Sequence, residues 1–223
     1  MQLSERALSI HQRLLDYYGF PAWRHPLPPI DELVSTILSQ NTNDTNRDLA
    51  FHTLRKRFPM WEQVRDADPQ QVVEAIRSAG LANQKGPRIQ SALRQITEKR
   101  GELDLDFLRN MSPQDARQWL EQFKGVGPKT SAIVLQFSLG MPAFPVDTHI
   151  YRVTGRLGIR PPQMNVEKTH KFLADLLPEE TYYPLHLNLI RLGREICQAR
   201  HPKCPQCMLQ DLCDYYADNY PSS

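Results

Sequence analysis

The sequence predicts an all-α protein. Residues that start and end helices recur along nearly the whole chain, and patterns typical of β-strands are nearly absent. The 18 prolines lie mainly at predicted helix boundaries rather than in a low-complexity tract. We therefore expect about ten helices joined by short loops.

The first two clear helices follow from an apolar face and from capping residues. In DELVSTILSQ, residues 31–40, the side chains of Leu33, Ile37 and Leu38 fall on one face of a helix. Residues 68–80 begin with an aspartate followed by a proline and end with a glycine. Aspartate favours the N-cap, proline the first helical position and glycine the position after the last turn, so this segment also predicts a helix.

The second half of the chain repeats these signals. Ser112 precedes a proline and, three residues later, an aspartate, which is typical of a capping-box-like helix start. A further helix should run over 128–139, with Gly140 behind it. Asn165 or a neighbour begins the next helix, and a long one is expected over 181–196.

Composition is typical of a soluble globular protein. Hydrophobic residues make up 40% and charged residues 23%, and the formal net charge is +2 with a pI near 8.3. This charge neither requires nor excludes nucleic acid, because a DNA-binding surface depends on where the cations cluster. The chain start lacks a secretory pattern and no apolar run could span a membrane, so we expect a cytoplasmic protein. The Pro-rich segment 20–30 is the predicted crossing between two domains.

Four cysteines, Cys197, Cys204, Cys207 and Cys213, follow the spacing C-x6-C-x2-C-x5-C. Four thiols so close together indicate a metal centre rather than a disulfide framework, which usually spreads along a small secreted chain. A zinc ion and a [4Fe–4S] cluster both accept four cysteine ligands. Zinc sites more often pair two short knuckles, and only one short pair is present, so the spacing favours iron–sulfur and leaves zinc as the alternative.

The loop between the first two cysteines is basic. It reads QARHPK and contains Arg200 and Lys203. A metal centre that pins a short cationic loop would make a rigid contact for DNA phosphates. The alternative is a solvated loop without a ligand.

The stretch FKGVGPKTSA, residues 123–132, raises the question of what Lys129 does. A nucleotide-binding phosphate loop needs glycine before the lysine and a strand before the loop, whereas here a proline precedes the lysine and WLEQFKG is helical. The stretch instead predicts helix, tight turn, helix, with Gly125 and Gly127 in turn conformations that side chains resist. The N–H groups near Gly125, Val126 and Gly127 would then point outward and suit a DNA phosphate. The alternative is a turn that only joins two packed helices.

Three segments together resemble the endonuclease III family: FKGVGPKTSAIVL, FPVDTHIYRVTGR and the cysteine tail. Members of this family are helix-hairpin-helix DNA glycosylases with a C-terminal iron–sulfur cluster, and the resemblance covers nearly the whole chain. It implies a helical domain over 30–141 that contains the hairpin. Residues 1–29 and 142–223 would form a second helical domain with the cluster loop, and a cleft would separate the two. The resemblance also favours [4Fe–4S] over zinc.

The resemblance implies a catalytic pair. Lys129 falls where the family carries an amine that attacks C1′ of the damaged nucleoside, displaces the base and forms a Schiff base to the sugar. β-Elimination would then cut the strand; the alternative is a phosphate-contacting lysine. Asp147 in PVDTHIYRV is, on its own residues, an N-cap. The resemblance adds a carboxylate that stabilises positive charge on the sugar and assists deprotonation.

The resemblance also implies residues that enter the duplex when the damaged base leaves the stack. Gln40 and Asn41 lie where the family inserts a polar plug, and Leu81 lies where it carries an apolar wedge. The alternative for Gln40 and Asn41 is the C-terminus of a helix, and the alternative for Leu81 is a position in the core. Many members have glutamine where Asn41 falls, an aromatic where Ala82 falls and a basic residue where Pro128 falls, which leaves the preferred lesion open.

The expected function is base excision repair by a monomeric enzyme associated with the nucleoid. It would act on double-stranded DNA that contains damaged bases, chiefly oxidised pyrimidines, or abasic sites, as a combined DNA N-glycosylase and AP lyase. The cluster would be structural. The alternatives are a monofunctional mismatch glycosylase and a DNA-binding protein with little turnover.

Overall fold

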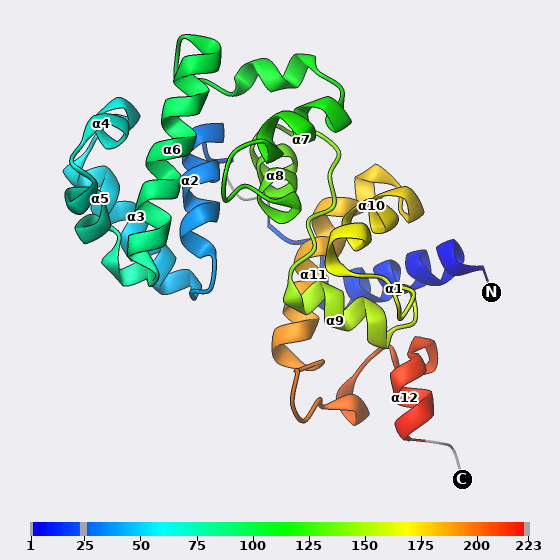
Figure 1. The fold of residues 1–223 in the computed structure, drawn as a ribbon. Helices are drawn as coiled ribbons and strands as arrows, with labels where there is room; N and C mark the ends of the chain where they lie inside the picture. The colour runs from blue at the N-terminus through cyan, green and yellow to red at the C-terminus, as the bar shows by residue number, and fades with distance from the viewer. Residues whose placement is uncertain (1, 23–25, 221–223) are drawn as a thin grey trace. The chain divides into compact units, whose positions relative to one another are not determined.

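The computed structural model describes residues 2–22 and 26–220, and the chain divides into two compact units. One unit is formed by residues 26–141 and the other by residues 1–25 with 142–223. Each unit is built of helices (Figure 1), and the described residues contain no β-strand, which confirms the all-α prediction. Part of the predicted crossing, residues 23–25, lies outside the described residues.

The unit 26–141 is built around α2 and the long helix α6. Its elements are α2 (Pro29–Ser39), α3 (Asp44–Arg57), α4 (Trp61–Asp66), α5 (Pro69–Ala75), η1 (Arg77–Ala79), α6 (Ala82–Arg100), η2 (Asp106–Asn110), α7 (Pro113–Glu121), α8 (Pro128–Ile133) and η3 (Val134–Ser138). Helix α6 packs against α4 and α5, and α2 packs against α3 and α8. The predicted apolar face of α2 is confirmed, since Leu33, Ile37 and Leu38 are fully buried.

Two predicted helices of this unit are interrupted. Over 68–80, Asp68 caps the start by accepting from the Gln70 N–H at 2.8 Å, but the α-helix ends at Ala75. The 3-10 turn η1 then carries the chain from buried Ile76 to Gly80, whose φ is +66°. The helix predicted over 128–139 widens after Ile133 into the π-helical turn η3, in which the Leu139 N–H donates to the Val134 carbonyl at 3.1 Å.

The predicted cap of α7 is confirmed with a different side-chain pairing. The Ser112 hydroxyl accepts from the Asp115 N–H at 3.1 Å and donates to the Asp115 carboxylate at 2.6 Å. In a capping box the acidic side chain accepts instead from the backbone N–H of the cap residue. The cap therefore satisfies one of the first amides of the helix.

The other unit has its own core around α11. Its elements are α1 (Leu3–Tyr18), α9 (Thr148–Arg156), α10 (Val166–Leu176), η4 (Glu179–Thr181), α11 (Tyr182–Glu195), η5 (Cys204–Gln206), η6 (Gln210–Leu212) and α12 (Asp214–Asn219). Helix α11 contacts both α1 and α9 (Figure 1), and it buries Leu185, Leu189 and Leu192. Asn165 caps α10 by accepting from the Lys168 N–H at 2.9 Å, as predicted.

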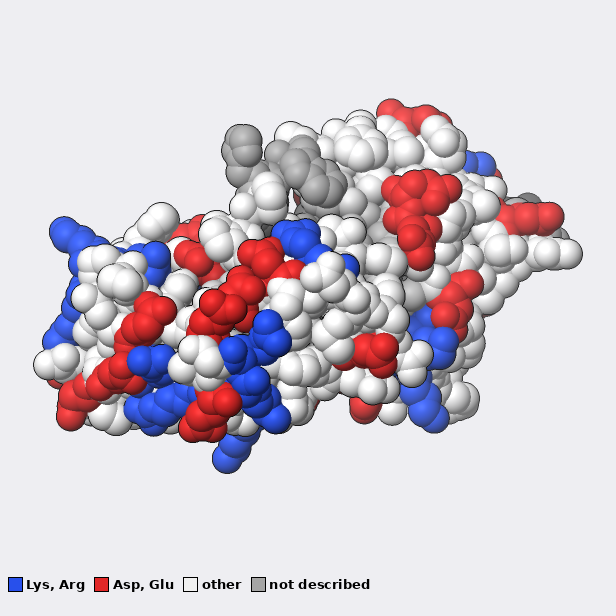
Figure 2. All heavy atoms as spheres, turned by 90° about the horizontal axis from the view of Figure 1, so that it is seen from above, with Lys and Arg blue, Asp and Glu red and all other residues white. Residues whose placement is uncertain are grey.

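Charged side chains of both signs share the face of the molecule that is visible in Figure 2. On the face in Figure 2, lysine and arginine side chains are interspersed with aspartate and glutamate. Arg65 pairs with Asp66 at 2.6 Å and Arg47 with Asp44 at 3.0 Å, for example. Within the described ranges, every helix is too short or too polar to cross a bilayer.

Candidate functional site

The hairpin between α7 and α8 uses only one left-handed glycine. Gly125 has φ +92°, whereas Gly127 has φ −105° and ψ −175°, the extended conformation that a residue before proline favours. The prediction of a turn conformation that side chains resist is therefore wrong for Gly127. The Val126 N–H is not free either, because it donates to the Phe123 carbonyl at 3.0 Å. Among the described residues, the N–H groups of Gly125 and Gly127 have no acceptor.

Lys129 is exposed on the first turn of α8, directly after Pro128. The next two residues, Thr130 and Ser131, are buried. The Ser131 hydroxyl lies 2.8 Å from a carboxylate oxygen of Glu121 at the end of α7, and the short contact fastens the two helices of the hairpin. The backbone at Lys129 is thereby held in place while its amine is open to solvent.

The two hairpin glycines should respond differently to substitution. Gly125→Ala is expected to lower the free energy of unfolding by about 1–2 kcal/mol, because an L-residue resists a left-handed φ. Its Cβ would also lie 2.9 Å from Cδ of Arg88. Gly127→Ala should change stability by about 0.5 kcal/mol or less, since no atom lies within 4 Å of the added Cβ. Urea unfolding followed by circular dichroism measures both, and equal losses would contradict this assignment.

Asp147 belongs to the other unit, where it caps α9. Its carboxylate accepts from the Ile150 N–H at 2.8 Å, so the N-cap interpretation is confirmed. The segment before it is held by two buried histidines: the Val146 N–H donates to Nδ1 of His170 at 3.2 Å, and Nδ1 of His186 lies 3.0 Å from the Pro145 carbonyl oxygen. These contacts fix the backbone that presents the carboxylate.

The four cysteines line one pocket together with apolar side chains. The lining includes Val153, Leu157, Leu192 and Ile196 as well as Cys197, Cys204, Cys207 and Cys213. Burial raises the pKa of the Cys207 thiol to about 11 and also raises the pKa of the Cys204 and Cys213 thiols. A cysteine in this pocket would therefore ionise to the thiolate only with positive charge beside it. No three possible ligands among the described residues converge closely enough to share a single metal ion.

Helix α9 also anchors the start of the cysteine loop. Arg152 donates to the Cys197 carbonyl at 3.1 Å and to the Gly193 carbonyl at 2.8 Å. One turn later, Arg156 donates to the Gln198 carbonyl at 2.7 Å and lies 3.4 Å from Sγ of Cys197. Both arginines belong to the segment FPVDTHIYRVTGR, but the sequence alone gives neither of them a role. The same helix thus carries Asp147 at its start and holds the cysteine loop from its later turns.

The predicted phosphate contacts of this loop are exposed. Arg200 and Lys203 both lie at the surface, and His201 between them has a left-handed φ of +51°. The loop is short and closes on itself, since the Lys203 N–H donates to the Ile196 carbonyl at 3.0 Å. Its two cationic side chains are therefore free of the core.

The predicted plug and wedge residues lie in the unit 26–141. Asn41 and Leu81 are both exposed and left-handed, with φ of +52° and +49°, and Leu81 is 47% exposed. The core alternative for Leu81 is therefore wrong. Gln40 differs from Asn41, because its Nε2 donates to the Gly125 carbonyl at 3.1 Å and its Oε1 lies 3.4 Å from Arg88. Asn41 faces solvent, whereas Gln40 ties its loop to the hairpin.

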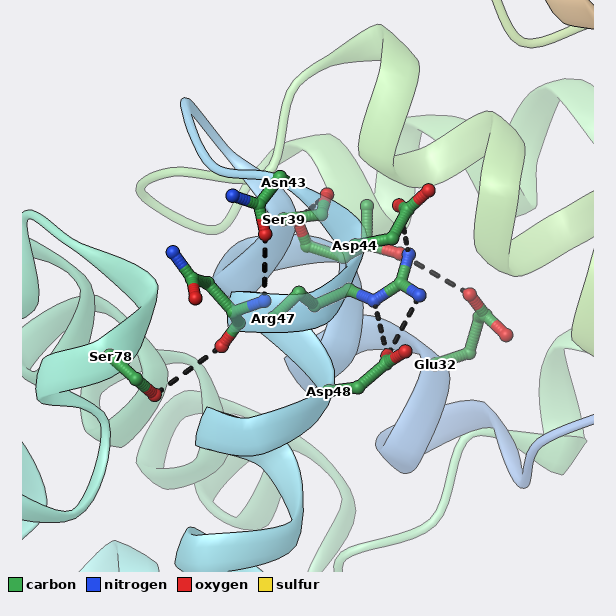
Figure 3. A network of polar contacts seen from close by, with 9 residues as sticks. Glu32, Ser39, Asn43, Asp44, Arg47, Asp48 and Ser78 are labelled. Atoms are coloured by element: carbon green, nitrogen blue, oxygen red, sulfur yellow. Dashed lines mark hydrogen bonds and ion pairs between the residues drawn. The ribbon is translucent and has the colours of Figure 1, made fainter.

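The segment after Asn41 is fixed by polar contacts (Figure 3). Asn43 caps α3 by accepting from the Asn46 N–H at 2.8 Å, and Arg47 donates to Asp44 at 3.0 Å. The Ser78 hydroxyl of η1 lies 3.3 Å from the Asn46 carbonyl oxygen, as the dashed line from Ser78 in Figure 3 shows. This bond joins the segment that follows Asn41 to the one that precedes Leu81.

The sequence matches the family model "HhH-GPD superfamily base excision DNA repair protein" over residues 34–179. Endonuclease III of Thermotoga maritima is 34% identical over 200 residues, which are 88% of each chain. Endonuclease III of Sulfolobus acidocaldarius is 33% identical over 189 residues, 84% of this chain and 82% of the other. A plant protein from Arabidopsis thaliana that is named as a DNA glycosylase is 39% identical over 168 residues, 75% of this chain and 57% of that longer protein.

Solved structures agree with these relatives. A trapped endonuclease III–DNA covalent intermediate is similar with a TM-score of 0.82 and 26% identity, covering 98% of this chain and 99% of the other. A thermostable thymine-DNA glycosylase shares the fold, with a TM-score of 0.78, 22% identity and coverage of 96% and 98%. The chain therefore belongs to the HhH-GPD superfamily of base excision DNA repair proteins and is an enzyme of the endonuclease III type, the class of DNA N-glycosylases and AP lyases.

Proposed function

We propose that the protein is a bifunctional DNA glycosylase and AP lyase that removes damaged, chiefly oxidised, pyrimidines from duplex DNA and cuts the strand at the abasic site. The observation that carries this proposal is Lys129, an exposed amine on a fixed helical turn. It falls where the endonuclease III family carries its catalytic amine. A similar structure is a covalent intermediate between endonuclease III and DNA, which requires a nucleophile on that protein.

The chemistry follows from an amine and a carboxylate. The neutral Nζ of Lys129 would form a bond to C1′ while the bond from C1′ to the base breaks, and the base leaves with the bonding electrons and takes up a proton. Transfer of an amine proton to the ring oxygen opens the sugar and leaves an iminium between Nζ and C1′. Loss of the C2′ proton then expels the 3′ phosphate. The Asp147 carboxylate would stabilise positive charge on the sugar, and it would carry that single proton from the amine nitrogen to the ring oxygen, so that the iminium nitrogen keeps its other proton.

Duplex DNA would be held by surfaces on both units. The free amides of Gly125 and Gly127 suit a phosphate, as do the exposed side chains of Arg200 and Lys203. Asn41 and Leu81 would fill the space from which the damaged base is extruded. The exposure of both residues supports this role, and so does the left-handed backbone of Leu81, since strained residues gather at functional sites. The proposed enzyme acts as a monomer.

Cys197, Cys204, Cys207 and Cys213 would hold a [4Fe–4S] cluster. All four line one apolar pocket, as the four-cysteine ligation of such a cluster requires, and the resemblance to the endonuclease III family favours the cluster over zinc. When bound, the cluster supplies positive charge for four thiolates and fixes the loop, and it takes no part in bond making. Arg152 and Arg156 hold the backbone of that loop from α9.

Cys204→Ser is expected to remove the cluster and weaken DNA binding. The wild-type protein should contain iron and sulfide and absorb broadly at about 400 nm, and the variant should lose most of both. Its affinity for duplex DNA should fall about tenfold or more, because the loop that presents Arg200 and Lys203 is no longer fixed. Metal analysis and fluorescence anisotropy provide the measurements. A colourless wild-type protein that contains zinc would contradict the cluster assignment.

Borohydride trapping tests the proposed function directly. Wild-type protein is incubated with duplexes that carry thymine glycol, an abasic site, a G·T mismatch or no lesion, because borohydride reduces a Schiff base to a stable covalent complex. Complexes on thymine glycol and on the abasic site, with none on undamaged DNA, are expected. Base release from the mismatch without trapping would indicate a monofunctional glycosylase. Binding without base release on any duplex would indicate a DNA-binding protein.

A further inference from the structure

Lys85 is a buried cation that the proposed reaction does not use. It lies in the first turn of α6 and is 1% exposed, so its whole side chain is inside the unit 26–141. Its Nζ donates to the Leu38 carbonyl at 2.7 Å and to the Ala79 carbonyl at 2.8 Å. Burial lowers the pKa of the Lys85 amine. Keeping an ammonium away from water is costly, and these two carbonyls are the groups that offset the cost.

The two carbonyls belong to the ends of two elements. Leu38 lies in the last turn of α2, and Ala79 is the last residue of η1. Carbonyls at a helix end lack partners within the helix and carry partial negative charge, which favours a cation. One amine therefore ties together the ends of elements that are 47 and 6 residues away from it in the sequence.

Each tied element leads, after one intervening residue, into an exposed residue with left-handed backbone. Asn41 follows α2 and Leu81 follows η1, and both are left-handed without being glycine. For leucine this conformation costs free energy and persists only where the surroundings fix the backbone, whereas asparagine adopts it readily after a helix. The same contacts fix the backbone near both residues. Lys85 bonds to both elements, and Ser78 of η1 bonds to the Asn46 carbonyl (Figure 3).

Arg88 extends the same connection to the hairpin. It lies three residues after Lys85 on α6, so the two side chains are neighbours on the helix surface. Its guanidinium lies 3.4 Å from Oε1 of Gln40, and its stem lies against Gly125. The segments that lead to Asn41 and to Leu81, and the hairpin at Gly125, are therefore all in contact with the first turns of α6.

We propose that Lys85 is a positioning residue for base extrusion: its buried amine holds the ends of α2 and η1 at a fixed separation, so that Asn41 and Leu81 enter the duplex as a pair. The proposal rests on the proposed function in one respect, namely that these two residues enter DNA. Lys85 itself touches neither DNA nor the reacting atoms. Loss of the Lys85 amine should therefore impair base extrusion directly, and bond cleavage only as a consequence.

Lys85→Met tests the proposal, because methionine keeps the length of the side chain and removes the donor. Gln90→Met is the matched control on the same helix: Gln90 is 2% exposed and donates to the carbonyls of Val64 and Ala67, near α4. The two readouts are affinity for a duplex with a stable abasic-site analogue and the fluorescence of 2-aminopurine opposite that analogue, which rises when side chains that enter the duplex unstack this base. Lys85→Met should weaken binding about tenfold and reduce the fluorescence rise, whereas Gln90→Met should change affinity by about twofold or less.

A double-mutant cycle separates positioning from general destabilisation. In a protein that already carries Asn41→Ala and Leu81→Ala, Lys85→Met should cost about twofold or less in affinity, because the residues through which it acts are gone. A full tenfold loss in that background would overturn the proposal. If Lys85→Met does not fold, Lys85→Gln retains a neutral donor and should give a smaller loss that is removed in the same background.

The binding readouts need no base release, so failure of the two proposals can be told apart. A wild-type protein that binds the analogue and raises the 2-aminopurine fluorescence, but cuts no strand that carries a lesion, would overturn the proposed function. The role of Lys85 would then still be decided by the double-mutant cycle. A wild-type protein that cuts the strand, together with a Lys85→Met variant of normal affinity and normal fluorescence rise, would overturn only the role of Lys85. Lack of wild-type binding would overturn both.

Discussion

Lys129→Ala is expected to abolish the covalent complex formed with borohydride on thymine glycol and abasic duplexes. Strand cleavage should fall about 10³-fold or more, the scale of loss when a covalent nucleophile is removed. Without the amine no Schiff base forms at C1′, so neither reduction nor β-elimination can follow. Rapid-quench assays under single-turnover conditions, run beside the trapping gel, give the rate.

The fold should survive this change. Lys129 is exposed and its side chain has no hydrogen bond or ion pair among the described residues, and alanine is a better helix former than lysine. The melting temperature should therefore stay close to that of wild type, and the affinity for a stable abasic-site analogue should fall only modestly. A large loss of both would mean that the rate reports damage to the hairpin rather than loss of a nucleophile.

Lys124→Ala is the matched control for charge. Lys124 is exposed in the same hairpin, directly before Gly125, and carries the same amine. Its removal should leave trapping intact and change binding by about threefold or less, the scale of one phosphate contact. If Lys129→Ala is still trapped and Lys124→Ala is not, the nucleophile is Lys124, and our proposal has named the wrong lysine.

The helix starts could be predicted from sequence because each depends on a few neighbouring residues. Asp68, Ser112, Asp147 and Asn165 all accept an N–H from a residue two or three positions later. Nothing outside the local segment is needed to choose that conformation. The conformation of Gly127 could have been predicted in the same way, since a residue before proline favours extended backbone.

The connections among the loops could not be predicted, because they depend on residues far apart in the sequence. Gln40 bonds to the Gly125 carbonyl 85 residues away, and Lys85 bonds to the Leu38 carbonyl 47 residues away. One local signal was present and was missed: Lys85 occupies the apolar face of α6 that continues with Ile89, Leu93 and Ile96. A cation at such a position indicates buried acceptors, although the sequence does not identify them.

Asp147→Asn should separate the capping role of Asp147 from its chemical role. An asparagine oxygen can still accept from the Ile150 N–H, so the cap is kept and the free energy of unfolding should fall by about 1 kcal/mol or less, mainly through lost charge at the helix start. The rate of base removal should fall about 10²–10⁴-fold, the usual contribution of a positioned acid or base. Single-turnover base release and urea unfolding measure the two effects.

Asn165→Ala supplies the comparison that makes this result decisive. Asn165 caps α10 in the same unit with the same geometry, its side chain accepting from the Lys168 N–H at 2.9 Å. Its removal should cost about 1 kcal/mol of stability and leave base release near the wild-type rate. Asp147→Ala should show both losses, because it removes cap and charge together. If Asp147→Asn is as active as wild type while Asp147→Ala is not, the carboxylate acts only by holding the start of α9, and the charge that stabilises the sugar must come from another group.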